Sequence, residues 1–159
     1  MQLSTICLNI LIISPLYSNF LTELAYWIYK NGGNGLSDTN FQDYIQYYSS
    51  NFNLPIPIEE IIGKLRNVNI CAYNSLNQYN FCYTYIYYFF VAKYIAEHIE
   101  TEKKLITKII ENLHKDENAY ITIFIFHHTK SNYLLDELLL NAEILFENFR
   151  KKKKSFSEA

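Results

Sequence analysis

Residues 69–83 of the chain, NICAYNSLNQYNFCY, contain two short runs that favour β-strands, Asn69 to Tyr73 and Tyr79 to Tyr83. The segment between them, residues 74–78, is polar and contains Asn and Ser, which favour turns. Aromatic and aliphatic runs that flank such a segment are typical of paired strands. The stretch therefore predicts an antiparallel β-hairpin with a five-residue loop.

Three amphipathic helices are predicted before the hairpin, because apolar residues recur there at intervals of three and four. Asn19 can cap the first helix, and the glycines at 32–33 can end it. Ser37 or Asp38 can cap the second. Residues 54–57, LPIP, predict an extended connector in which Pro57 suits the first position of the third helix. The apolar stripes are Phe20, Leu24, Trp27 and Ile28, then Phe41, Tyr44, Ile45, Tyr48 and Phe52, then Ile58, Ile61, Ile62, Leu65 and Val68.

More helices are predicted after the hairpin. Residues 85–98 are apolar nearly all round but too short to span a bilayer, so we expect a helix in a core. Residues 105–113 are amphipathic. Residues 118–128 are rich in β-branched and aromatic side chains, yet no partner strand lies nearby, and we predict a helix there. A last helix covers 134–149, and positive charge follows at 150–154, where the helix dipole favours it.

The order of these elements predicts a mainly α (α+β) fold. Three helices followed by a hairpin are typical of a winged-helix domain, which we place at residues 18–98. A helical extension follows over 99–150, and a basic tail over 151–159 is expected to fray. Residues 1–17 form an apolar N-terminal segment without the basic start of a signal peptide. We interpret that segment as a buried helix or a misassigned start of the chain.

Composition excludes several classes of protein. Hydrophobic residues make up 50% of the 159 residues, which is enough for a core, and the formal net charge of −2 provides no overall basic field for nucleic acid. The predicted third helix offers only Lys64 and Arg66 beside two glutamates, so DNA binding is not expected. The cysteines Cys7, Cys71 and Cys82 do not form a disulfide framework. Cys71 and Cys82 could face each other across the hairpin, but buried reduced thiols in a cytoplasmic protein are expected.

No motif indicates an enzyme. A phosphate-binding loop requires G-x-x-x-x-G-K-[ST], and the Gly63-Lys64 pair lies inside a predicted helix without the rest of that motif. The paired carboxylates lie near predicted helix starts, with no nucleophile to accompany them. Metal-ligand spacing is also missing around the histidines, so we expect no catalytic residues, cofactor or metal. The histidines are His98, His114, His127 and His128.

Residues 81–92, FCYTYIYYFFVA, resemble a motif of the STAND-class NTPases, signalling ATPases that include the NACHT proteins. In that class the last strand of a winged-helix hairpin enters a helix through a motif like F-x-H-x-x-[FI]-x-[ED]-[YF]-[FL]-x-A. The family's His corresponds to Tyr83 and its acidic position to Tyr88. Residues 20–32 and several stretches between 92 and 130 are similar to a bacterial branch of the class, so the resemblance covers about residues 18–149. The matching motif positions are Phe81, Ile86, Phe89, Phe90 and Ala92.

The resemblance implies a non-catalytic regulatory piece of a STAND-type NTPase from a bacterial defence or signalling system. In the family the winged-helix domain folds back on the bound nucleotide and its motif His can touch the ADP phosphate. Tyr83 is therefore the candidate nucleotide-sensing position, although a tyrosine donates a hydrogen bond without carrying charge. Because the phosphate-binding loop is absent, the resemblance implies a truncated or split protein.

The expected partner is a protein: a missing or separately encoded ATPase module, or a second copy of the chain. Aromatic residues make up 17% of the chain, more than a small domain easily hides, and tyrosine suits surfaces that become buried on assembly. These tyrosines could instead lie flat on their own helices. Two alternative functions remain: a free-standing helical adaptor, and a small membrane-associated protein that uses residues 3–17 and the basic tail. The interface candidates are Tyr47, Tyr48, Tyr73, Tyr79, Tyr87 and Tyr88.

Overall fold

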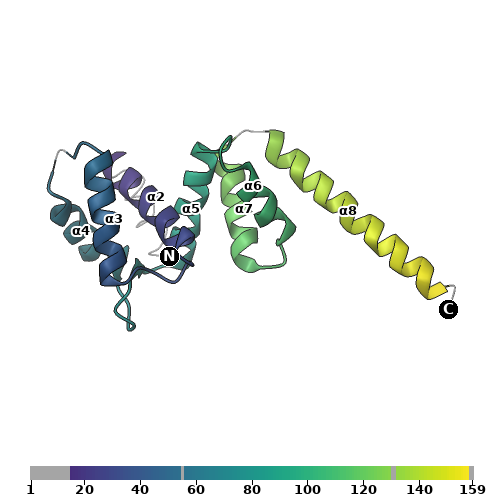
Figure 1. Cartoon of the computed structure of the whole chain (residues 1–159), viewed down its shortest axis with the longest axis horizontal. Helices are drawn as coiled ribbons and strands as arrows, with labels where there is room; N and C mark the ends of the chain where they lie inside the picture. The colour runs from purple at the N-terminus through teal and green to yellow at the C-terminus, as the bar shows by residue number, and fades with distance from the viewer. Residues whose placement is uncertain (1–14, 55, 130–131, 158–159) are drawn as a thin grey trace. The chain divides into compact units, whose positions relative to one another are not determined.

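The computed structural model describes residues 15–54, 56–129 and 132–157 (Figure 1). Its contacts divide the chain between Tyr94 and Ile95 into two compact units, here called unit 1 and unit 2. The described part is mainly helical and contains a single two-stranded antiparallel hairpin, which confirms the mainly α (α+β) prediction. The predicted apolar segment 1–17 lies outside the described residues except for its last three.

The described residues of unit 1 form three helices, the hairpin and most of a fourth helix. The helix that the sequence predicts from Asn19 begins at Pro15 in the structure, so the predicted cap at Asn19 is wrong. Proline fits the first turn of a helix, and Asn19 instead accepts a hydrogen bond from the Tyr48 hydroxyl at 2.8 Å. The elements are α2 (Pro15–Lys30), α3 (Asp38–Asn51), α4 (Ile58–Asn67), β1 (Cys71–Tyr73), β2 (Tyr79–Phe81) and α5 (Thr84–Glu97).

The helix ends of unit 1 mostly follow local sequence signals. Ser37 caps α3, and its hydroxyl accepts a hydrogen bond from the Asn40 amide at 3.3 Å. Pro57 occupies the cap of α4, one residue before the predicted position. Val68 is 42% exposed, so its place in the predicted buried stripe is wrong. The reason is that α4 ends one residue earlier and Asn69, at φ 55°, turns the chain.

The hairpin is confirmed, with strands of three residues each. Cys71 lies opposite Phe81, and Tyr73 lies opposite Tyr79. The side chain of Asn74 organises the loop, because its Oδ1 accepts hydrogen bonds from the amides of residues 76 and 78 at 2.9 and 3.0 Å. Asn77 has a φ of 55°, a left-handed conformation that asparagine tolerates.

A further β-bridge joins the loop before α3 to the hairpin. The Leu36 amide donates to the Tyr79 carbonyl at 2.9 Å, and the Tyr79 amide donates to the Leu36 carbonyl at 2.7 Å. Gly35 allows this approach, since its φ is +95° and an added Cβ would lie 3.1 Å from the Tyr79 carbonyl oxygen. Leu36 is fully buried. The bridge therefore ties the segment between α2 and α3 to β2.

Aromatic rings form a cluster within the core of unit 1, beside buried aliphatic side chains. Phe20 of α2 packs edge-on against Tyr44 and Tyr48 of α3, with ring centroids 5.4 and 5.1 Å apart. Phe41 stacks on Tyr79 at 4.0 Å, which joins α3 to the hairpin. The buried Tyr44 hydroxyl donates to the Phe20 carbonyl oxygen at 2.8 Å, so this polar atom is satisfied inside the core.

Unit 2 comprises the end of α5 and three more helices, α6 (Lys103–Glu111), α7 (Asp116–His128) and α8 (Asn132–Ser157). The helix predicted at 118–128 is confirmed, and Thr122 uses its hydroxyl to donate to the Asn118 carbonyl oxygen within it. The last helix, α8, continues to Ser157, beyond the predicted end at residue 149, and the fraying of the tail over 151–159 stays a prediction. The helix dipole favours basic residues at this end.

Replacing Gly35 with Ala is expected to destabilise unit 1 by about 2 kcal/mol, because an L residue is strained at positive φ and its Cβ would press on β2. The matched control is Gly63→Ala, which lies inside α4 with nothing within 4 Å of the added Cβ. That variant should gain about 0.5–1 kcal/mol from helix propensity. Urea unfolding followed by circular dichroism measures both, and equal shifts of the same sign would contradict the role assigned to Gly35.

Candidate functional site

The structure separates the six candidate tyrosines into two groups. Tyr48, Tyr79 and Tyr87 are 1%, 0% and 5% exposed, so the expectation that they lie on the surface is wrong. Tyr48 follows Tyr44 by one helical turn and shares its inward face. Tyr79 stacks on Phe41. These three side chains are part of the core of unit 1, and the structure does not place them at an accessible interface.

Tyr47, Tyr73 and Tyr88 remain accessible. Tyr47 is 36% exposed, and its ring lies 4.9 Å from that of Trp27, which joins α3 to α2. Tyr73 is 40% exposed at the end of β1 and packs edge-on against Tyr79 at 5.4 Å. Tyr88 on α5 is half-buried. Each of these rings contacts the protein on one side and is accessible on another, a combination that suits a binding surface. Their role in binding stays a prediction.

The surroundings of Tyr73 connect three elements. Partial burial and a hydrogen bond with Asp38 raise the pKa of Tyr73, whereas nearby Arg66 lowers it. Asp38 begins α3 and Arg66 lies in the last turn of α4. Tyr73 thus presents a polar group at the place where β1, α3 and α4 approach one another.

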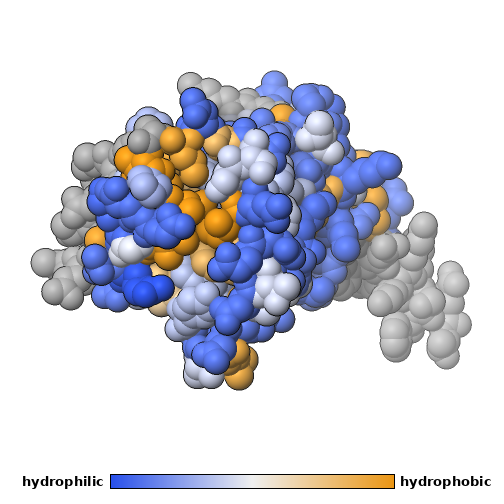
Figure 2. Space-filling model, turned by 60° about the vertical axis from the view of Figure 1, so that its left-hand side comes forward, coloured by the Kyte–Doolittle hydropathy of each residue, from blue (hydrophilic) through white to orange (hydrophobic). Residues whose placement is uncertain are grey.

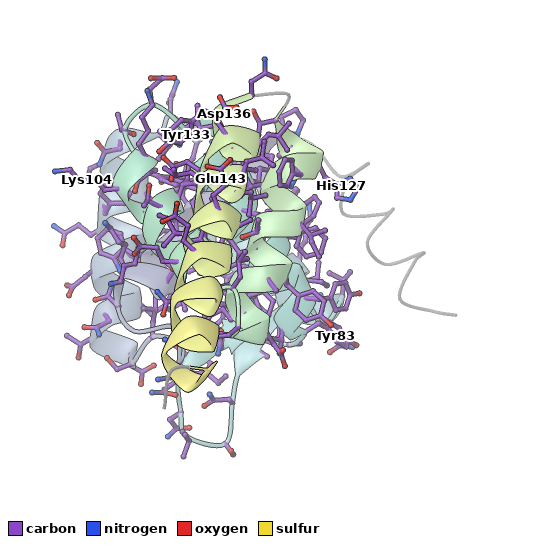
Figure 3. The ribbon with its side chains drawn as sticks, turned by 90° about the vertical axis from the view of Figure 1, so that its right-hand side faces the viewer. Tyr83, Lys104, His127, Tyr133, Asp136 and Glu143 are labelled. Atoms are coloured by element: carbon purple, nitrogen blue, oxygen red, sulfur yellow. The ribbon has the colours of Figure 1, made fainter. Side chains whose placement is uncertain are left out.

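Tyr83, the position of the family's motif His, lies directly before α5. Its carbonyl oxygen accepts hydrogen bonds from the amides of Ile86 and Tyr87 at 3.1 and 3.2 Å, which starts the helix. The side chain is half-buried, and its ring centroid is 6.4 Å from that of Tyr85. In Figure 3 it lies at the edge of the view and points outward. The side chain is therefore accessible, and its contact with a nucleotide stays a prediction.

The described residues contain no group of three or more His, Cys, Asp or Glu side chains that could hold a metal ion. Cys71 is a buried free thiol and Cys82 an exposed one. Burial raises the pKa of both thiols, which favours the protonated form over the reactive thiolate. None of the helices in the described ranges is long and apolar enough to cross a bilayer. The face seen in Figure 2 is mostly polar, with one larger apolar area and smaller apolar spots elsewhere.

Unit 2 contains contacts that the sequence analysis missed. The Thr107 hydroxyl on α6 donates to Glu137 Oε2 on α8 at 3.2 Å, and the Lys103 ammonium lies 5.4 Å from the centre of the Tyr133 ring. Figure 3 shows Tyr133 near the start of α8. These contacts attach the first turns of α8 to α6. The helical spacing of these residues could have indicated which faces of α6 and α8 meet. No sequence motif identifies the residues that make the contacts.

Comparison with known families relates the chain to the STAND NTPases. Residues 34–91 match the model of a family described as Novel STAND NTPase 4. The matched stretch contains the Gly35–Leu36 segment, α3, α4, the hairpin and the first half of α5. No curated protein and no solved structure matches the chain. The match supports a relation to the STAND NTPases over the part of unit 1 that contains the β-bridge and most of the aromatic core.

Alkaline titration is expected to separate the buried tyrosines from the exposed ones. Burial raises the pKa of Tyr48 to about 12, and it also raises the pKa values of Tyr44 and Tyr79. In the unfolded chain these groups ionise near pH 10, so the unfolded state releases their protons first. Their contribution to stability is therefore complete below pH 10 and is lost as the pH rises from 10 towards 12.

The measurement is tyrosinate absorbance, recorded beside circular dichroism. The buried tyrosines should ionise only together with unfolding, and Tyr48→Phe should remove one of these delayed ionisations. Ionisation of all 15 tyrosines near pH 10 while the fold persists would contradict the packing described here.

Proposed function

We propose that residues 18–98 form a winged-helix-like module that regulates a STAND-type NTPase and has no catalytic activity of its own. The observation that carries the proposal is the Leu36–Tyr79 bridge within the stretch that matches the STAND family. With this bridge, the order of elements in unit 1 is α2, the β-segment at Leu36, α3, α4, the hairpin and α5. A winged-helix domain has this order, and in the resemblance described above such a domain closes the nucleotide module.

The charge distribution supports a protein partner over nucleic acid. Lys64 on α4 forms a 2.8 Å ion pair with Glu60 one turn earlier, so the helix that would enter a DNA groove carries a balanced surface. Accessible tyrosines, in contrast, suit a protein interface, because each combines an apolar ring with a hydroxyl that tolerates water. The proposed partner is a nucleotide-binding module, on the same chain or encoded separately, in a bacterial defence or signalling system.

The test uses the full chain and a nucleotide-binding module of the Novel STAND NTPase 4 family supplied in trans with ADP. Calorimetry or sedimentation should detect a complex, and Tyr47→Ser combined with Tyr73→Ser should weaken it by about tenfold or more. Leu76→Ser is the matched control, because Leu76 is 75% exposed at the hairpin tip and lies outside the proposed surface. Absence of a complex, or equal weakening by the control, would contradict the proposal.

The absence of catalysis is tested separately. The purified chain should not hydrolyse ATP, because its sequence has no phosphate-binding loop motif and no recognisable pair of a nucleophile and a base. Turnover that persists through repurification and is abolished by a single substitution in this chain, such as Tyr83→Phe, would refute the non-catalytic assignment.

A second function, that of a free-standing helical adaptor, is favoured by the apolar side chains that unit 2 exposes. Leu135 and Leu139 of α8 are 49% and 55% exposed, and α7 exposes further apolar residues. An adaptor would bind its partner through unit 2, so truncation after Glu102 would abolish adaptor binding. The same truncation should leave binding to an NTPase module intact if the first proposal holds.

A further inference from the structure

The outer face of α7 is apolar over nearly two turns. Tyr120, Ile123 and Phe126 are 51%, 52% and 39% exposed. They are spaced three residues apart, so they lie on one side of the helix, opposite the buried Ile121 and Ile125. We call these three residues the α7 stripe.

The sequence of α7 distinguishes this stripe from an ordinary solvent-facing surface. No residue from 118 to 126 is charged, although this stretch includes the outward side of a helix in a small unit. A helix that is apolar on all sides is normally covered on all sides. Isolated exposed apolar residues need no explanation, but a continuous stripe on an uncharged stretch of helix is typical of a surface that is buried on assembly.

The order of residues along the stripe is self-complementary. Tyr120 and Phe126 are aromatic and lie at equal distances in sequence on either side of Ile123. The first turn of α7 contains acidic residues, beginning with Asp116, and the last turn contains His127. In Figure 3 His127 points outward at the edge of the view. Two antiparallel copies would place each acidic end beside the histidine end of the other, and would also oppose the helix dipoles favourably.

We propose that the α7 stripe is a self-association surface on which a second copy of this chain packs with its α7 antiparallel. In this arrangement Ile123 lies on the two-fold axis and faces its equivalent, while Tyr120 of each copy faces Phe126 of the other. The interface is isologous, because the same patch serves both copies. This inference is independent of the regulatory role proposed for unit 1.

The size of the stripe determines the strength of the dimer. A single short helix covers much less than the roughly 800 Å² per partner of a standard interface. The dimer is therefore weak and concentration-dependent, in rapid exchange with monomer. The measurable consequence is a weight-average mass that rises with concentration in sedimentation equilibrium.

The test replaces Ile123 with opposite charges in the full chain. Ile123→Glu and Ile123→Lys each place like charges face to face on the axis. The dissociation constant of each variant's dimer should therefore rise by about tenfold or more over that of the parent chain. A mixture of the two variants should recover association. Leu139→Glu is the matched control, since Leu139 is a similarly exposed leucine on α8, and this variant should dimerise like the parent chain.

Disulfide trapping tests the orientation. In a background with Cys7→Ser and Cys82→Ser, a mixture of the Tyr120→Cys and Phe126→Cys variants should give mainly the mixed dimer, whereas a parallel pair would give the two homodimers. The proposal is overturned if the parent chain stays monomeric at its highest soluble concentration, or if Leu139→Glu and not Ile123→Glu dissociates it. Association with thioflavin fluorescence and loss of helix would equally overturn it, by indicating cross-β aggregation of this β-prone segment.

Discussion

Two hydrogen bonds between Leu36 and Tyr79 connect the helical part of unit 1 to its hairpin. They depend on Gly35, whose missing side chain lets the loop approach β2. The same pairing positions the Tyr79 ring, which stacks on Phe41 and so sets where α3 meets the hairpin. The stretch that matches the STAND family includes all of these residues. One backbone pairing thus connects the loop, α3 and the hairpin within the stretch that matches the family.

The large number of tyrosines has two physical roles. Tyr44 and Tyr48 provide apolar rings for the core, and their hydroxyls reach acceptors on α2, so that burial leaves no unsatisfied group there. Tyr47 and Tyr73 keep part of each ring accessible at the edge of the same core. One residue type therefore supplies both the packing that stabilises unit 1 and the surface proposed to bind a partner.

The sequence predicted those parts of the fold that local chemistry determines. The hairpin follows from two strand-prone runs around a polar turn, and the start of α3 follows from Ser37. The Leu36 bridge was missed because a single residue pairs with Tyr79, which is distant in the sequence. The only local indication of the bridge was Gly35, which precedes it. The burial of Tyr48 could have been predicted, since it belongs to the apolar stripe of α3. The exposure of the α7 stripe could not, because no charged residue between 118 and 126 marks an outward side of the helix.

The proposed regulatory role depends on unit 1 behaving as a single cooperative module in which the loop, α3 and the hairpin move together. Native-state hydrogen exchange of the Leu36 and Tyr79 amides tests this most directly, because each donates one of the bridging hydrogen bonds. Both amides should exchange only through global unfolding of unit 1, as slowly as the most protected amides of α2. Rapid exchange at Leu36 while the hairpin amides stay protected would show that the bridge is not part of the cooperative unit, and would contradict the account.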